Sequence, residues 1–407
     1  MYSLPLRRLK DILSHVIPEA TLVSVDDLKT TQLARLYILN MSDDRKLLLS
    51  CAPSLTTRLL RHEGTMMTTE AALIHFIAES GSGSTRHQKT GSSSSVVETE
   101  RISELPDMSE LVPKLLKHSA NNREMAYPYS IFEPTPGSPL STQSMYLSIP
   151  VRRIIDAKIG SIARSLANLI SPISLFGPVS QVLGDPFTAP VPGAASIKST
   201  GSKTWSEAFN ILLEMILRDG EDMAVSLPYD EIRGHYKKQK RKLDAITTPR
   251  LSILDIGTES NVMIERILDL DSSIPPESCV KITGLRSWSG GIFGDPLISS
   301  CFDGPGEGFL EAWRVGGQDI VEDQENAEGR MLLYSCYRAV VAIVTEYYRP
   351  KGDSSRMELA GRRKLTDALK GLEVIDNDGD GGGERIEVLK RPRSLESDRE
   401  EVKRQRM

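Results

Sequence analysis

Residues 249–265 read PRLSILDIGTESNVMIE and residues 280–297 read VKITGLRSWSGGIFGDPL, and the fold prediction rests on these two stretches. In the first, the short apolar runs LSIL and NVMI predict two strands joined by a turn that contains Asp255. The second combines ITG, a tryptophan and GDPL, which is the most specific pattern in the chain. We work outward from these stretches to the elements on either side.

The residues before these stretches predict a strand-rich lobe. Residues 21–53 contain YIL, the polar turn MSDDRK and the apolar run LLLSCAP, which together indicate a hairpin. Residues 58–80 have apolar positions at helical spacing and predict a helix packed on the sheet. A second strand pair is expected within LVPKLLKHSA (111–120) and YPYSIFEPTPGSPLS (127–141).

Two segments rich in glycine, serine or proline interrupt this lobe and end it. Residues 81–95, GSGSTRHQKTGSSSS, carry too few apolar side chains to offset the entropy of ordering, so a mobile loop is predicted. The Pro/Gly-rich segment from Glu133 to Leu140 predicts the lobe boundary. The expected lobes are therefore residues 1–136 and 137–350.

The second lobe is predicted to be larger and mostly helical. WSEAFNILLEMIL (205–217) has one apolar stripe at the spacing of an amphipathic helix. MLLYSCYRAVVAIVTEYYRP (331–350) predicts a buried helix that ends at Pro350. Residues 351–407 are expected to form a flexible, charged, disordered tail with one short helical stretch, RKLTDALKGLEVI.

Composition excludes several classes of protein. The chain has 407 residues, of which 39% are hydrophobic and 26% charged, which excludes a wholly disordered or collagen-like protein. Its 50 basic and 55 acidic residues give a net charge of −5, which argues against a protein that binds nucleic acid or membrane over its whole surface. The four cysteines are too far apart for a zinc cluster or a disulfide framework.

No targeting or spanning segment is expected. The N-terminal residues lack the long apolar region of a secretory signal, and the most apolar stretch, Ile159 to Val179, is interrupted by prolines and by Arg164. We expect an intracellular protein of the nucleus or cytoplasm, without membrane contact. The basic stretch Lys237 to Asp244 is expected to be a solvated helix face that does not read nucleic acid directly.

The quoted segments resemble the aminoglycoside phosphotransferase and choline-kinase-like family, in the style of its fungal branch. RLLRHEGTMMTTEAALIHFI is similar to the helix whose glutamate pairs with a phosphate-binding lysine, and YSIFEPTPGSPL is similar to the hinge. Residues 249–265 and 280–297 resemble the catalytic and metal loops. The resemblance covers roughly residues 15 to 350. It implies a bilobal α+β fold of the protein-kinase type that uses ATP and Mg²⁺ to phosphorylate a small-molecule hydroxyl.

Two parts of the phosphate-binding machinery that the resemblance implies are missing. The turn within SVDDLKTTQLARLY has no glycine to let the backbone approach a phosphate. The lysine of the family falls on Ser50. Without that lysine, the helix glutamate, which is Glu70 or alternatively Glu63, lacks the cation with which it pairs in the family. We expect either glutamate to be a solvated residue on a helix face.

The catalytic and metal loops are also altered. The family has an asparagine five residues after its catalytic aspartate, whereas Asn261 follows Asp255 by six. A one-residue bulge would restore Asp255 as the base and Asn261 as a metal ligand; the alternative makes Asp255 a turn-capping or solvated acid. The family's chelating aspartate falls on Ser287, and Asp295 is expected to brace the loop.

The sequence therefore predicts a degenerate pseudokinase that acts as a regulatory or binding protein, with a protein partner or small molecule in the cleft between its lobes and no certain cofactor. The alternative is a phosphotransferase with a rearranged site, in which Asp255 is the base and Asn261 with Glu259 or another acid holds magnesium beside ATP. A third interpretation is an unrelated two-domain structural protein.

The C-terminal residues carry two further patterns. Lys390 and Arg391, then Lys403, Arg404 and Arg406, have the spacing of a bipartite signal for a nuclear import carrier. The alternative is a solvated charged helix, because acidic residues are interleaved with the bases.

DNDGDGGGERIE (376–387) fits the calcium-loop pattern, with Asp376, Asp378, Asp380 and Glu387 as oxygen ligands and a glycine at Gly381. We expect a flexible acidic linker here instead, because no second loop exists and Pro392 prevents a regular exit helix.

Overall fold

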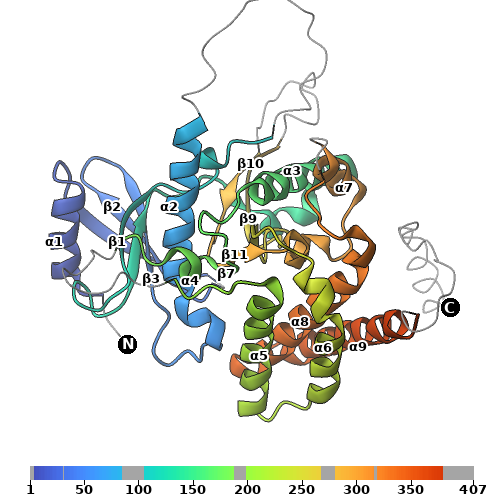
Figure 1. Cartoon of the computed structure of the whole chain (residues 1–407). Helices are drawn as coiled ribbons and strands as arrows, with labels where there is room; N and C mark the ends of the chain where they lie inside the picture. The colour runs from blue at the N-terminus through green and yellow to red at the C-terminus, as the bar shows by residue number, and fades with distance from the viewer. Residues whose placement is uncertain are drawn as a thin grey trace, which may run out of the picture.

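The computed structural model describes residues 4–30, 32–84, 105–187, 199–266, 280–315 and 319–378. Its N-terminal lobe contains a five-stranded sheet, and its C-terminal lobe is mostly helical (Figure 1). Within these ranges no helix is both long and apolar enough to span a membrane.

The N-terminal sheet is antiparallel throughout and has the strand order β1-β2-β3-β5-β4. Its strands are β1 (Leu22–Leu28), β2 (Arg35–Met41), β3 (Lys46–Cys51), β4 (Leu115–Ser119) and β5 (Tyr129–Phe132). Both predicted strand pairs are confirmed. In the first hairpin Leu39 faces Leu47 and Tyr37 faces Leu49, so alternate apolar side chains point into one buried layer.

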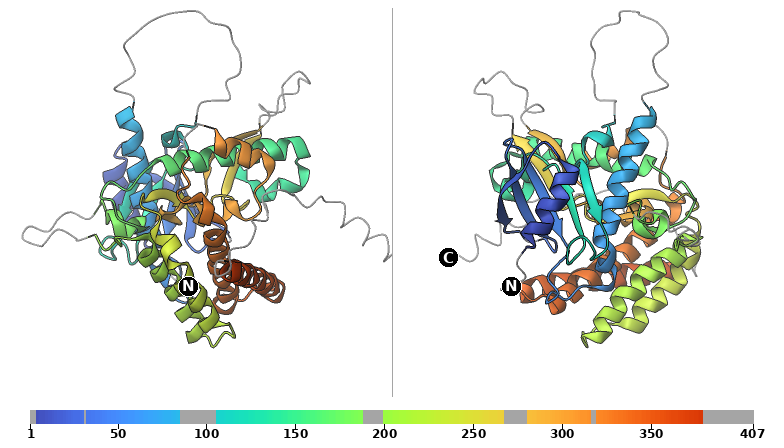
Figure 2. Two further views of the ribbon diagram at one scale, coloured as in Figure 1. Left: turned by 45° about the vertical axis from the view of Figure 1, so that its right-hand side comes forward. Right: turned by 90° about the vertical axis from the view of Figure 1, so that its left-hand side faces the viewer.

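Two helices pack on this sheet. Helix α1 (Leu6–Val16) inserts Leu9 and Leu13 into the apolar layer of the strands, and Figure 2 shows it lying across the outer face of the sheet. Helix α2 (Met66–Ser84) confirms the predicted helix and contacts β4, β5 and also β11 of the C-terminal lobe. Phe76 of α2 meets Phe293 edge to face at 5.6 Å. Helix α2 therefore belongs to the interface of the two lobes.

The hinge follows β5. Gly137 has φ +90°, and a Cβ there would lie 2.3 Å from the carbonyl oxygen of Ile264, so only glycine fits. The next residues form β6 (Ser138–Pro139), the edge of a sheet with the order β10-β9-β6. A third sheet has the order β7-β11-β8. Their strands are β7 (Gly177–Pro178), β8 (Arg250–Ile253), β9 (Val262–Arg266), β10 (Val280–Leu285) and β11 (Gly291–Gly294).

The helices of the C-terminal lobe form one apolar core with these small sheets. They are α3 (Ile149–Asn168), α4 (Val179–Leu183), α5 (Trp205–Asp222), α6 (Tyr229–Asp244), α7 (Glu307–Arg314), α8 (Ala327–Tyr348) and α9 (Ser354–Asp378). The predicted apolar stripe of α5 is confirmed, because all six of its members are buried: Trp205, Phe209, Leu212, Leu213, Ile216 and Leu217. Helix α8 ends just before Pro350, as predicted.

The prediction of a flexible tail from residue 351 is wrong for its first part. Residues 354–378 form α9, which lies along α8 (Figure 1) and buries Leu365, Ala368, Leu369 and Leu372. Gly361 brings the two helices close, since a Cβ there would be 2.8 Å from a side-chain carbon of Ile343. The apolar residues at i, i+3, i+4 and i+7 gain a partner in α8, which the charged composition obscured.

The remaining predictions about loops and the tail fall mostly on residues outside the described ranges. Residues 81–84 belong to α2 rather than to the predicted loop, and residues 85–95 lie outside the described residues. The import residues Lys390, Arg391, Lys403, Arg404 and Arg406 also lie outside them.

The start of the expected acidic linker is helical, because Asp376 and Asp378 belong to α9. Asp376 also accepts hydrogen bonds from Gln239 and is paired with His235 and Lys238. The carboxylate at the first position of the calcium pattern therefore binds side chains of α6.

Candidate functional site

A cavity of about 290 Å³ lies between the lobes. The N-terminal lobe contributes the turn before β2, strand β3 and helix α2, and the C-terminal lobe contributes the segments around Asp255 and Ser287. The structure thus brings together the five positions that the resemblance singled out: Ser50, Glu70, Asp255, Asn261 and Ser287. We call this cavity the cleft.

The cleft has no cation at the position of the family's lysine. Ser50 lies on β3 between Leu36 of β2 and Ser130 of β5 and is 3% exposed. Lys46 is at the opposite, exposed end of the strand. The cation among the described lining residues is Arg286, and no ion pair links it to a described carboxylate. A triphosphate would therefore meet a hydroxyl at Ser50 where the family has a charge.

Glu70 is not the solvated helix residue that we expected. Its Oε1 accepts hydrogen bonds from the backbone nitrogen of Trp288 at 2.8 Å and from the Ser287 hydroxyl at 3.3 Å. Burial raises the pKa of Glu70, although these two hydrogen bonds oppose the shift, and the charge of Asp255 raises it further. The glutamate binds the C-terminal lobe directly, without a lysine between them.

Glu63 is also paired, but with Arg349 and outside the cleft. Its carboxylate forms a two-pronged ion pair with Arg349, at 2.7 Å on each oxygen, and accepts the backbone N–H of Leu60 at 2.8 Å. It therefore anchors the start of the 3₁₀ helix before α2 to the C-terminal lobe. The expectation that Glu63 is solvated is wrong, and Glu63 does not line the cleft.

Asp255 lines the cleft and is neither a cap nor a solvated acid. Its Oδ1 is buried without a hydrogen-bond partner among the described residues. Burial raises the pKa of Asp255 to about 6, against a small opposing effect of its own backbone N–H. Gly290 lies against it, because a Cβ at Gly290 would be 3.1 Å from that oxygen. A partly protonated carboxyl near neutral pH is a feature of functional sites.

Asn261 holds the opposite wall of the cleft together. Its amide donates to the Ser287 carbonyl at 3.2 Å and accepts the Ser287 N–H at 2.8 Å, and the side chain is buried. The Ser287 hydroxyl is shared in turn with Ser289 at 2.9 Å. These two side chains are thus engaged in hydrogen bonds within the protein.

The residues of the cleft do not fit a magnesium–ATP complex. Mg²⁺ demands a tight octahedral set of oxygens and is usually bound through one or two carboxylates, substrate phosphates and waters, whereas Ser287 supplies a neutral hydroxyl that already bonds to Glu70. Glu259 is exposed, pairs with Arg152 at 3.6 Å and is not part of the lining. The described residues contain no group of three or more His, Cys, Asp or Glu side chains able to hold a metal.

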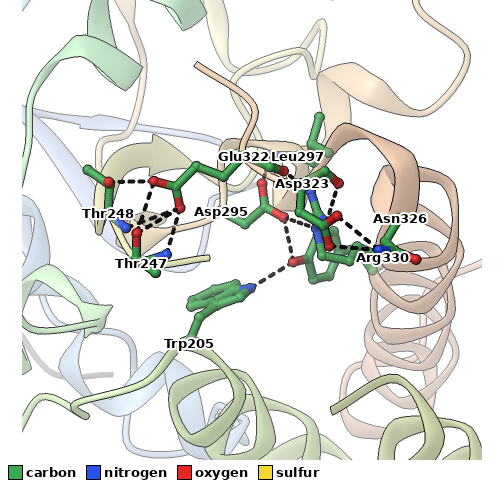
Figure 3. A network of polar contacts seen from close by, with 10 residues as sticks. Trp205, Thr247, Thr248, Asp295, Leu297, Glu322, Asp323, Asn326 and Arg330 are labelled. Atoms are coloured by element: carbon green, nitrogen blue, oxygen red, sulfur yellow. Dashed lines mark hydrogen bonds and ion pairs between the residues drawn. The ribbon is translucent and has the colours of Figure 1, made fainter. Parts of the chain in front are cut away.

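Asp295 performs a bracing role in the core next to the cleft segments. It is fully buried and accepts hydrogen bonds from Arg330 and Tyr334 at 2.8 Å each, and from the backbone of Leu297 at 3.1 Å. Tyr334 in turn accepts the indole N–H of Trp205 at 2.7 Å. Figure 3 shows this network reaching Glu322 and Thr248 through Arg330. The GDPL segment is thereby fixed to α5 and α8.

Two of the cleft-wall residues that sequence reasoning missed have polar atoms that bear on function. Arg286, the residue before Ser287 in the chain, lines the cleft. A charged residue directly after the apolar strand KITGL is the sequence signal that could have identified it. Trp288 is 1% exposed, and its indole nitrogen is buried without a hydrogen-bond partner among the described residues. In the sequence this tryptophan identifies the motif but gives no sign that it lies on the wall of the cleft.

A second cavity, of about 670 Å³, lies in the C-terminal lobe between α3, α7 and β10. Its floor is mostly apolar, and Arg153, Lys158, Lys281 and Glu311 stand around it. Arg153 is paired with Glu311 at 2.7 Å, and Lys158 donates to a backbone carbonyl at 2.6 Å.

No family model and no curated protein matches this sequence. Solved structures do match. A protein from Ralstonia eutropha JMP134, provisionally named an aminoglycoside phosphotransferase, has a TM-score of 0.53 at 9% identity and covers 91% of this chain and 99% of its own. One from Haemophilus somnus 129PT, provisionally named a fructosamine-3-kinase, has a TM-score of 0.52 at 13% identity and covers 88% and 97%.

A third structure, from Thermobifida fusca and also provisionally named a fructosamine-3-kinase, has a TM-score of 0.50 at 12% identity and covers 90% of this chain and 98% of its own. The match extends over both lobes, which argues against the interpretation as an unrelated two-domain protein. At these identities the likeness establishes the fold alone. This chain has the bilobal, kinase-like fold shared by these phosphotransferase-type proteins.

Proposed function

We propose that this protein is a pseudokinase: a kinase-like phosphotransferase fold that has lost phosphoryl transfer and acts by binding a partner or small molecule in its cleft. The observation that carries the proposal is the set of contacts of Glu70. Its carboxylate bonds to Trp288 and Ser287, while Ser50 stands where a lysine would pair with it. The membership in a fungal branch of the family stays a prediction.

The chemistry of phosphoryl transfer supports this proposal. The transferred phosphoryl group needs cations on its oxygens and metal ions that neutralise the developing charge. Loss of the lysine and of the chelating aspartate removes two such contributions. Each is worth about 3 kcal/mol of transition-state stabilisation, or roughly a hundredfold in rate.

An assay of ATP turnover tests the proposal. Purified full-length protein is incubated with Mg²⁺, ATP and panels of small alcohols and amines, with Asp255→Ala as the control for contaminating kinases. We expect no turnover above that of the control. Turnover by the wild type that the substitution abolishes would overturn the proposal.

The second candidate is a phosphotransferase with a rearranged site, and Asp255 favours it. This carboxyl faces the cleft and its burial raises the pKa to about 6, which suits a general base. Asn261 and ATP with Mg²⁺ would complete that site. Glu259 would have to leave Arg152 to join it.

We further propose import into the nucleus through the two basic clusters of residues 390–406. The support is their spacing and charge alone. Fusion of residues 385–407 to a fluorescent reporter tests this proposal. Nuclear accumulation that is lost on replacing Lys403, Arg404 and Arg406 by alanine is the expected result, and diffuse fluorescence of the unaltered fusion contradicts it.

A further inference from the structure

The cleft holds two carboxyl groups that pair with no cation in the part of the chain that the structure describes. Glu70 and Asp255 both line it, and neither forms an ion pair within the described residues. The nearby cation Arg286 is on the same lining but pairs with neither. Uncompensated charge in a partly buried site is costly, and such sites take a partner of opposite charge or become protonated.

A second observation also points to a missing ligand. Oδ1 of Asp255, an acceptor on the cavity wall, is buried without a hydrogen-bond partner among the described residues. Buried polar groups are satisfied in the great majority of proteins, so an unpaired carboxyl oxygen on a cavity wall calls for a donor. The cavity of about 290 Å³ is at the small end of the range for ligand pockets.

We infer that the cleft binds a small molecule bearing a primary ammonium or guanidinium group, which Glu70 and Asp255 hold by charge-assisted hydrogen bonds. The ligand supplies the positive charge that Ser50 does not. Ammonium and guanidinium groups carry several N–H donors and no acceptor, which matches two carboxylates with free acceptor sites. This inference rests on the proposed function, because a triphosphate in the same cleft would bring negative charges next to Glu70.

Titration of the full-length protein with n-butylammonium chloride and with methylguanidinium chloride, followed by thermal unfolding, tests the inference. We expect a saturable rise in unfolding temperature. Sodium chloride at equal ionic strength and neutral n-butanol should give none. Glu70→Gln and Asp255→Asn keep the shape of each side chain but remove its charge, and each is expected to weaken binding at least about tenfold.

Glu207→Gln is the matched control, because Glu207 of α5 is an exposed carboxylate that stands outside the lining. It should leave the shift unchanged. Ser50→Lys provides an independent variant, since its own ammonium enters the cleft and should abolish the response to amines. The wild-type affinity should also rise as pH is raised through about 6, where Asp255 ionises. Burial also raises the pKa of Glu70, so ionisation of Glu70 acts in the same direction, while the ligand and Arg286 stay charged.

Three results would overturn the inference: no response to either cation, a response in Glu70→Gln and Asp255→Asn equal to that of the wild type, or a response to MgCl₂ without one to the amines. ATP turnover, measured separately, bears on the pseudokinase proposal. If the protein binds amines and does not turn over ATP, both the amine site and the pseudokinase proposal are supported. If it binds no amines and does not turn over ATP, only the amine site is refuted.

Discussion

At Ser50 the protein has a small hydroxyl in the middle of a sheet, facing a cleft that contains two carboxyl groups. The consequence is local. Glu70 accepts hydrogen bonds from the backbone of Trp288 and from Ser287, and one oxygen of Asp255 has no hydrogen-bond partner in the described part of the chain. The same few residues thus determine which charged groups the cleft can accommodate.

The raised pKa of Asp255 predicts a pH-dependent cost to stability. Its pKa rises from 3.8 to about 6 on folding, so between these values the folded state binds more protons than the unfolded state. The contribution of Asp255 to the free energy of unfolding therefore falls as pH rises from about 4 to about 6. Asp255→Asn should be more stable than the wild type at pH 7.5 by roughly 2 to 3 kcal/mol.

Urea unfolding of both proteins at pH 4 and pH 7.5 checks this prediction. The difference should be several-fold smaller at pH 4, because the carboxyl is protonated in the folded state there and pH 4 lies close to its unfolded-state pKa of 3.8. An equal difference at the two pH values would show that ionisation of Asp255 is not its cause.

Restoring a cation at Ser50 should reveal the unpaired charge of Glu70. Ser50→Lys introduces an ammonium that Glu70 can meet, whereas in Glu70→Gln the same lysine would be buried without a partner. A double-mutant cycle over the two positions should give a favourable coupling of about 1 to 3 kcal/mol. Chemical denaturation of the four proteins measures it, and additivity of the two single effects would contradict it.

At the scale of elements, the sequence predicts those helices and strands whose pattern lies within one short stretch of the chain. The hairpin of β2 and β3 and the stripe of α5 follow from periodicity, so both were predicted. Helix α9 was underestimated, because its apolar stripe stabilises a helix only against α8. The burial of Glu70 depends on Ser287, which lies 217 residues later in the chain. No local pattern carries that information.

Helix α9 is expected to contribute to stability rather than to act as a tail. Leu372 is fully buried, and Leu372→Ala should lower the free energy of unfolding by about 2 to 4 kcal/mol through the cavity it leaves. Leu359, on the same helix, is 50% exposed and provides the control, because Leu359→Ala should change it by less than about 0.5 kcal/mol. Equal effects at the two positions, measured by urea unfolding, would mean that α9 does not pack as described.

The hinge requires glycine at one position. Gly137→Ala places a methyl group against the Ile264 carbonyl in a left-handed backbone conformation, so a loss of stability of about 2 kcal/mol or more is expected. Gly64→Ala is the matched control, since nothing lies within 4 Å of a Cβ there. Thermal unfolding that is unchanged in Gly137→Ala would contradict this account of the hinge.

At the scale of the whole molecule, several charged contacts tie the two lobes together near the base of α2. Arg61 pairs with Asp219 and Asp222, and Glu63 pairs with Arg349. Asp295 and Arg330 fix the GDPL segment in the core. These contacts fix the scaffold around the cleft, in which Ser50 and Ser287 stand at the positions where the resemblance implies a lysine and an aspartate.

The most direct test of the pseudokinase proposal is a thermal-shift titration of the full-length protein with ATP, with and without Mg²⁺, because a ligand of the native state raises its apparent stability. We predict no magnesium-dependent shift up to millimolar ATP. A saturable, magnesium-dependent shift that Asp255→Asn removes would show that a working metal–nucleotide site persists beside Ser287, and it would contradict the proposal.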